Sequence, residues 1–129
     1  MFRIGYTVTT YVAQYVLPVA ALISPKLKDF LHQRKHANQP LKGPVKFWVH
    51  AASLGEYEMA LPLLAKLATN GNLEDILITI FSPSGYTQAL KGKYASRLMY
   101  LPLDTAANVS QFYHDYAPQK AIFIRYDLW

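Results

Sequence analysis

The carboxylate of Glu56 stands at a point in the sequence where ligands often bind in α/β proteins. Residues 47–50 are typical of a buried strand, and residues 51–55 are a turn of mostly small side chains. Small residues let a ligand approach the backbone, and a helix start offers unpaired N–H groups and a positive dipole. In open α/β sheets, ligands bind beyond the carboxyl ends of strands. Glu56 is therefore placed for chemistry on a ligand, although acidic residues in first turns also simply stabilise helices.

Hydroxyl groups and glycines lie in two expected strand-to-helix turns. Ser53 is most simply a helix N-cap, and with Gly55 it is also placed to hydrogen-bond a ligand. The second turn contains Ser82, Ser84 and Gly85, and its N–H groups could cradle a phosphate or a sugar. A plain turn explains the second group equally well, since Ser, Pro and Gly favour turns for local reasons.

These turns must be positioned by alternating strands and helices. Apolar runs predict strands at 45–50, 76–81, 97–101 and 120–125, while helical periodicity and caps predict helices at 55–69, 84–91 and 105–116. Continuous apolar runs indicate strands buried on both faces, as in parallel sheets. Strand–helix alternation then implies right-handed crossovers and a doubly wound sheet. The fold class is therefore α/β, with a Rossmann-like parallel sheet and flanking helices.

The N-terminal part differs sharply from the rest in charge and hydropathy. Residues 1–46 carry a balance of +6 and residues 47–129 a balance of −1, which together give the net charge of +5. Residues 4–25 carry no charged side chain, a length close to that needed to cross a bilayer core. Tyrosines there favour the lipid–water interface, and the lysines that follow would meet anionic head groups. We expect a membrane anchor that spans or lies in the interface; a buried helix and a signal-like segment are the alternatives.

The expected organisation has three parts. Residues 1–30 form the apolar and basic anchor helix, residues 31–44 a linker, and residues 45–129 the Rossmann-like domain. Pro and Gly at the end of 31–44 are typical of a linker. The basic side chains at 34–36 are either solvated there or contact lipid phosphates.

Several functional classes fit the sequence poorly. The chain has no Cys, which excludes disulfides and thiolate metal sites, and no metal-ligand cluster is visible. The turn after the first strand lacks Gly-x-Gly-x-x-Gly, which disfavours a dinucleotide-dependent oxidoreductase. The basic residues lie beside an apolar segment, so nucleic-acid binding is also disfavoured. His50 is more often a packed histidine than a catalyst at such a position.

Four motifs occur in a fixed order along the chain: His-Ala-Ala-Ser-Leu-Gly-Glu at 50–56, Phe-Ser-Pro-Ser-Gly at 81–85, Leu-Pro-Leu-Asp at 101–104, and Tyr-Asp-Leu-Trp at 126–129. Their order and spacing resemble the N-terminal part of the 3-deoxy-D-manno-octulosonic acid (Kdo) transferase family. The resemblance covers nearly the whole chain, including an apolar segment followed by basic residues.

This resemblance implies two Rossmann-like domains in the GT-B arrangement, of which the chain would be the N-terminal half. It implies transfer of Kdo from CMP-Kdo to a lipid A precursor, with inversion, at the cytosolic face of the inner membrane. The N-terminal domain would face the acceptor and an anionic membrane surface. The C-terminal domain would hold the donor, and we expect it to be missing from this chain. The mechanism needs no metal and no cofactor.

Within this resemblance, Glu56 maps onto the presumed general base, which takes the proton of the attacking sugar hydroxyl. Ser53, Gly55 and the turn residues 82, 84 and 85 would bind the acceptor. Asp127, where many family members have Glu, would lie on the donor side or at the domain interface. The alternative is a non-catalytic Rossmann-like module that binds anionic lipid or a protein partner.

Overall fold

The computed structural model of the chain describes residues 12, 15–16, 18–20 and 24–125. In this part of the chain, four parallel strands form one sheet in the order β3-β2-β1-β4. Their bounds are β1 (Phe47–Ala51), β2 (Ile76–Ile80), β3 (Leu98–Tyr100) and β4 (Lys120–Phe123). The predicted α/β class with a parallel sheet is confirmed. Asp127 and the motif at 126–129 lie outside the described residues.

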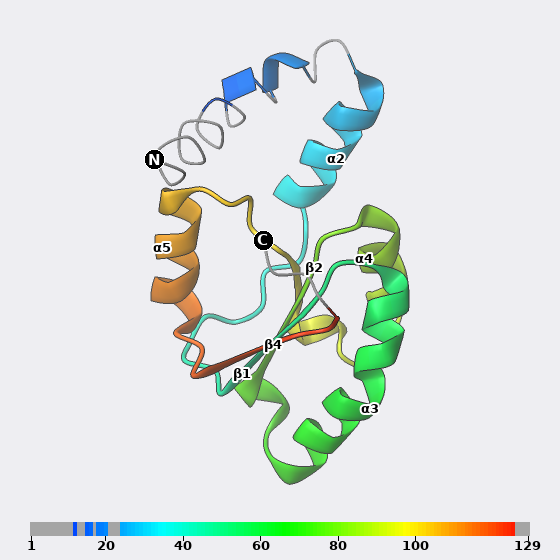
Figure 1. Cartoon of the computed structure of the whole chain (residues 1–129), viewed down its shortest axis with the longest axis vertical. Helices are drawn as coiled ribbons and strands as arrows, with labels where there is room; N and C mark the ends of the chain where they lie inside the picture. The colour runs from blue at the N-terminus through cyan, green and yellow to red at the C-terminus, as the bar shows by residue number, and fades with distance from the viewer. Residues whose placement is uncertain (1–11, 13–14, 17, 21–23, 126–129) are drawn as a thin grey trace.

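Helices cover both faces of the sheet (Figure 1). Helices α3 (Leu54–Asn70) and α4 (Pro83–Ala89) pack on one face, and α5 (Ala106–Tyr116) packs on the other. Two single 3₁₀ turns, η1 (Leu73–Asp75) and η2 (Ala95–Arg97), lead into β2 and β3. Thr105 caps α5 as predicted, because its hydroxyl accepts a hydrogen bond from the N–H of Asn108 at 3.2 Å.

The two faces of the sheet are packed differently. Toward α3 and α4, side chains such as Val49, Ile78 and Leu64 form a continuous core with no exposed surface. Toward α5, the buried cluster is smaller and includes Leu77 and Phe112. Strand β2 is buried along its whole length, which explains why all of its residues except Thr79 are apolar. The thinner packing on the α5 face leaves room for the cavity described below.

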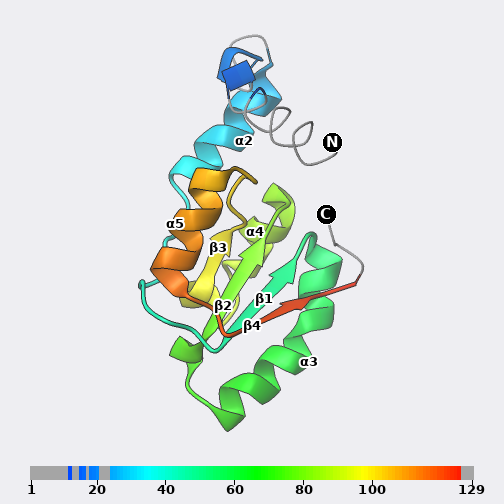
Figure 2. The same ribbon diagram turned by 60° about the vertical axis from the view of Figure 1, so that its left-hand side comes forward.

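Helix α2 (Pro25–Lys35) lies beyond the carboxyl ends of the strands (Figure 2). Residues 31–35, which the sequence assigned to the linker, form the last turns of this helix. The chain that follows is fastened to the domain by hydrogen bonds. The side-chain amide of Asn38 donates to the carbonyls of Ala95 and Leu98, at 3.0 Å each, and the hydroxyl of Tyr116 donates to Pro40 at 3.2 Å. The division of the chain into three parts remains a prediction.

The described residues ahead of α2 are helical at 12, 15–16 and 18–20. Val12, Tyr15, Val16 and Val19 expose more than half of their surface. Within the described ranges, no helix has both the length and the apolar character required to cross a membrane. The larger part of the expected anchor lies outside these ranges.

Candidate functional site

Three of the four sequence motifs meet at the carboxyl edge of the sheet. The N–H of Ser82 donates to the carbonyl of Ala52, so the turns after β1 and β2 are joined at 2.9 Å. The N–H of Leu101 donates to Ile80, also at 2.9 Å, which brings the third motif to the same edge. Strand order reverses direction at β1, since β2 lies on one side of it and β4 on the other. This is a topological switch point, where ligands bind in open α/β sheets.

Glu56 stands at that switch point, in the first turn of α3. Its Oε2 accepts hydrogen bonds from the N–H groups of Ala52, at 2.7 Å, and Ser53, at 3.0 Å. The carboxylate is half-buried, and Oε1 has no hydrogen-bond partner within the described part of the chain. One oxygen therefore fixes the side chain, while the other is left to accept a proton.

Ser53 and Gly55 flank the carboxylate. Ser53 is the N-cap residue of α3, as predicted, and has extended backbone geometry. Gly55 is exposed, and a Cβ atom added there would meet nothing within 4 Å. The backbone at Gly55 is thus open to a ligand approaching the helix start.

The second turn holds Ser82, Ser84 and Gly85 at the start of α4. The hydroxyl of Ser82 accepts from the N–H of Gly85 at 3.1 Å, which caps the helix. Gly85 is buried against the first turn: an added Cβ would lie 2.8 Å from the backbone nitrogen of Leu54. Gly85 therefore serves close packing between the two turns, while Ser84 is exposed beside them.

His50 is a buried side chain on the α5 face of β1. Its Nδ1 lies 2.9 Å from the hydroxyl oxygen of Thr79, its register neighbour on β2. This is the packed histidine that the sequence favoured. Within the described part of the chain, no group of three or more His, Asp or Glu side chains is placed to hold a metal ion.

Arg34 is a residue of this edge that the sequence did not identify. Its guanidinium donates to the carbonyl of Leu101 at 2.6 Å and to that of Phe81 at 2.9 Å. It also lies within 5 Å of the ring centres of Phe30, Phe81 and Tyr100. Burial lowers the pKa of the guanidinium, although the group remains charged near neutrality. Arg34 thus fastens α2 to the ends of β2 and β3, and a basic run followed by Pro gave no sign of this.

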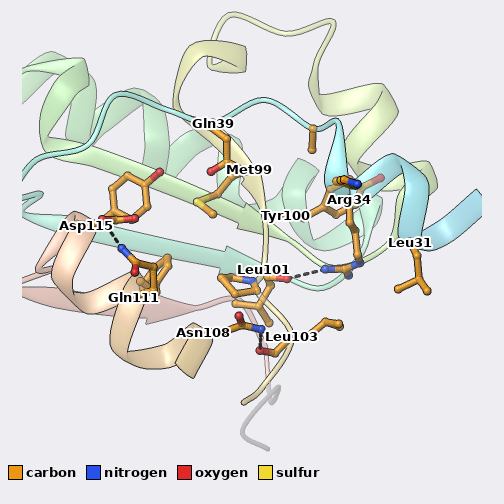
Figure 3. Close-up of a pocket in the computed structure, with 15 residues that line it drawn as sticks. Leu31, Arg34, Gln39, Met99, Tyr100, Leu101, Leu103, Asn108, Gln111 and Asp115 are labelled. Atoms are coloured by element: carbon orange, nitrogen blue, oxygen red, sulfur yellow. Dashed lines mark hydrogen bonds between the residues drawn. The ribbon is translucent and has the colours of Figure 1, made fainter. Parts of the chain in front are cut away.

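Two hollows adjoin the segment 101–103. The first, of about 370 Å³, lies between α2, residues 37–39 and α5, and is lined by Arg34, Asn108 and Asp115 among others (Figure 3). Asn108 and Arg34 approach the segment from opposite directions there and donate to the carbonyls of Leu103 and Leu101. The second hollow, of about 540 Å³, lies between α5 and the sheet, and we name it the α5 cavity.

The α5 cavity is mostly apolar and reaches the Glu56 turn. Trp48, Phe112 and Phe123 line it from inside, and the ring of Trp48 lies 4.8 Å from that of Phe112 and 5.4 Å from that of Phe123. Ala52, whose N–H donates to Glu56, also lines it. Phe81 is exposed at its rim.

The parallel sheet, the crossing helices and a carboxylate at the switch point define a Rossmann-like α/β domain. Residues 26–129 match the family model described as 3-deoxy-D-manno-octulosonic-acid transferase (kdotransferase). The chain belongs to this family.

Curated relatives agree with the family assignment. The chain is 27% identical over its whole length to the 3-deoxy-D-manno-octulosonic acid transferase of Haemophilus influenzae, covering 32% of that protein. It is 36% identical over 64% of its length to the enzyme of the same name from Aquifex aeolicus, covering 23% of it. It is 26% identical over 81% of its length to a bifunctional glycosyltransferase/methyltransferase of Fusobacterium nucleatum, covering 17%. The chain spans a third or less of these relatives.

Proposed function

We propose that the chain is the N-terminal, acceptor-binding part of an inverting glycosyltransferase that moves Kdo from CMP-Kdo to a lipid A precursor. Membership of the family supports the transfer of Kdo, and the names of two relatives agree with it. The observation that carries the proposal is the carboxylate of Glu56 at the switch point, held through Oε2 alone. In this proposal a second domain of the GT-B arrangement holds the donor, CMP-Kdo. Asp127 would lie on the donor side of the active site or at the interface between the two domains.

The proposed step uses Glu56 as general base. A hydroxyl of the acceptor attacks the anomeric carbon of Kdo and forms a new carbon–oxygen bond. The bond from that carbon to the phosphate oxygen of CMP breaks, and its electron pair leaves with CMP. Glu56 Oε1 takes the hydroxyl proton, a contribution of about 10²–10⁴-fold to the rate. Attack from the face opposite CMP inverts the anomeric centre.

Acceptor binding is proposed for the two turns beside Glu56. Gly55 leaves the backbone open, while Ser53, Ser82 and Ser84 offer hydroxyl groups at the same edge. Gly85 contributes by letting the two turns approach each other, since any side chain there would meet Leu54. The acceptor's sugar is thereby oriented toward Oε1.

Association with the cytosolic face of the inner membrane is part of the proposal. Val12, Tyr15, Val16 and Val19 are exposed ahead of α2, and Lys26, Lys28 and Lys35 are exposed along it. Arg34 is excluded from this set because its guanidinium is engaged with the domain. Exposed apolar side chains next to lysines favour an anionic lipid surface. The protein should co-sediment more strongly with vesicles rich in phosphatidylglycerol than with phosphatidylcholine vesicles. Equal binding to both kinds of vesicle would contradict the proposed association with an anionic membrane.

Replacing Glu56 by Gln in the intact protein tests the chemistry. The amide oxygen of Gln can still accept from Ala52 and Ser53, so the helix start is preserved while the base is lost. Transfer from CMP-Kdo should fall by about 10²–10⁴-fold. A variant that transfers Kdo at the normal rate would leave only the alternative, a non-catalytic module that binds anionic lipid or a protein partner.

A further inference from the structure

We infer that the α5 cavity holds one hydrocarbon chain of the lipid whose sugar lies at Glu56. This inference rests on the proposed function and adds a site for the apolar part of its acceptor. The cavity measures about 540 Å³, within the range of small-molecule sites.

The lining excludes most polar ligands. No Lys or Arg lines the cavity, so it offers no cation to a phosphate or carboxylate. The indole N–H of Trp48 donates to the hydroxyl of Thr79 at 2.8 Å, and Nδ1 of His50 lies 2.9 Å from the same oxygen. The indole N–H of Trp48 and Nδ1 of His50 are thus already engaged with the sheet. Asp104, which is exposed, is the one carboxylate among the described lining residues, and most of the remaining surface is aromatic and aliphatic, which suits a hydrocarbon chain.

The rim of the cavity points to an amphiphile. Phe81 is 45% exposed, Val109 is 42% exposed and Tyr113 is 51% exposed, and all three line the cavity. Large apolar side chains gathered around one hollow mark a binding groove more often than a plain surface. A hydrocarbon chain lying between α5 and the sheet would cover them.

The position of the cavity selects the occupant. Ala52 lines the cavity, and its N–H holds Glu56 Oε2 at 2.7 Å. One molecule can therefore place a hydroxyl at Glu56 and a chain in the cavity. A nucleotide or a soluble sugar would leave the apolar walls exposed, whereas a lipid acceptor would use both the Glu56 turn and the cavity beside it.

The fluorescence of Trp48 gives a direct test. The chain has two tryptophans, and Trp129→Phe leaves Trp48, inside the cavity, as the only one. Dibromostearate, whose bromine atoms quench tryptophan on contact, should quench the emission of this variant in a saturable way. Val109→Asp and Tyr113→Asp should each raise its dissociation constant by about tenfold, which corresponds to about 1.4 kcal/mol.

The matched control is Met59→Asp, which changes an equally exposed apolar residue on α3, away from the cavity. It should leave the dissociation constant unchanged, and far-ultraviolet circular dichroism should report the same fold for every variant. Quenching that does not saturate, or that falls equally in Met59→Asp and Val109→Asp, would overturn the inference. Quenching only by vesicles with brominated chains would assign the surface to bilayer contact and would also overturn it.

The quenching experiment can fail or succeed independently of the proposal that Glu56 is the general base. Glu56→Gln should leave quenching by dibromostearate unchanged, because this probe needs no base. If the intact enzyme transfers Kdo in a Glu56-dependent way but Trp48 shows no saturable quenching, the cavity inference fails and the proposed function stands.

Discussion

The turns that follow β1 and β2 share one plan but carry different side chains. Each joins the carboxyl end of a buried strand to the first turn of a helix. In the first, the carboxylate of Glu56 accepts the N–H groups of the turn and keeps one oxygen unengaged. In the second, the hydroxyl of Ser82 accepts the N–H of Gly85, and the glycine packs against the first turn. One turn thus carries the proposed base, while the other shapes the space beside it.

The largest structural effect should come from Gly85. Ala at this position would place a Cβ 2.8 Å from the nitrogen of Leu54, and backbone cannot move aside cheaply. We expect Gly85→Ala to lower the free energy of unfolding by about 3 kcal/mol. The matched variant Gly55→Ala meets open space and should be neutral or stabilising by up to about 1 kcal/mol. Urea unfolding measures both, and equal losses in the two variants would contradict the division between the turns.

A smaller effect is expected from Arg34, which fastens α2 to the second turn but not to the first. Replacing it by Met removes donors from the carbonyls of Leu101 and Phe81 and a cation from three aromatic rings. Arg34→Met should lower the free energy of unfolding by about 2 kcal/mol. Arg34→Lys keeps the charge but loses the planar fork, so its loss should fall between wild type and Met. A Lys variant as unstable as Met would show that charge contributes little.

The stability effect of Glu56 should be smaller again. Glu56→Ala leaves the N–H groups of Ala52 and Ser53 without their acceptor, and we expect a loss of about 1 kcal/mol. Glu56→Gln should be within about 0.5 kcal/mol of wild type because Gln also completes a capping box. Thermal unfolding of both variants separates the structural role of the side chain from its chemical role. A Gln variant as unstable as Ala would mean that the negative charge itself holds the turn.

The smallest effect on stability should come from replacing Asp115. This residue touches neither turn and so serves as a reference for the substitutions made in them. Its hydrogen bond with Lys42, at 2.9 Å, holds the pKa of this carboxyl below its ordinary value, with His114 and Gln111 contributing. A lowered folded-state pKa stabilises the protein above the ordinary pKa of Asp and loses this effect as the pH falls through the lowered value. The stability difference between wild type and Asp115→Asn should therefore be fully present near neutrality, begin to shrink near the ordinary Asp pKa of about 4, and be lost only below the lowered folded-state pKa. Chemical denaturation across that range measures it, and a constant difference would contradict the ion pair.

Much of this fold was predictable because local signals agree along the chain. Four apolar runs became the four strands, and Thr105 capped its helix as its position indicated. The turn of small residues before Glu56 indicated that this carboxylate lies at the start of a helix. These features depend on neighbours in sequence, which is why a single chain reveals them.

Other features depended on contacts between distant segments. Arg34 lies in a polar stretch typical of a linker, yet its guanidinium bonds Leu101, 67 residues away. Gly85 looked like a ligand-binding turn residue, and its packing against Leu54 follows only once two strands are neighbours. The α5 cavity likewise arises from side chains of separate elements. No local sequence pattern indicates which distant segments will contact one another.

We propose that the first turn performs the chemistry and that the second does not. The most direct test is Kdo transfer from CMP-Kdo by the intact protein, compared between Glu56→Gln and Ser82→Ala in one assay. We expect a loss of about 10²–10⁴-fold for Glu56→Gln. For Ser82→Ala, which removes the cap of α4, we expect a loss below about tenfold, together with a loss of about 1 kcal/mol of stability. Equal losses of transfer in the two variants, or normal transfer by Glu56→Gln, would contradict this division of roles between the turns.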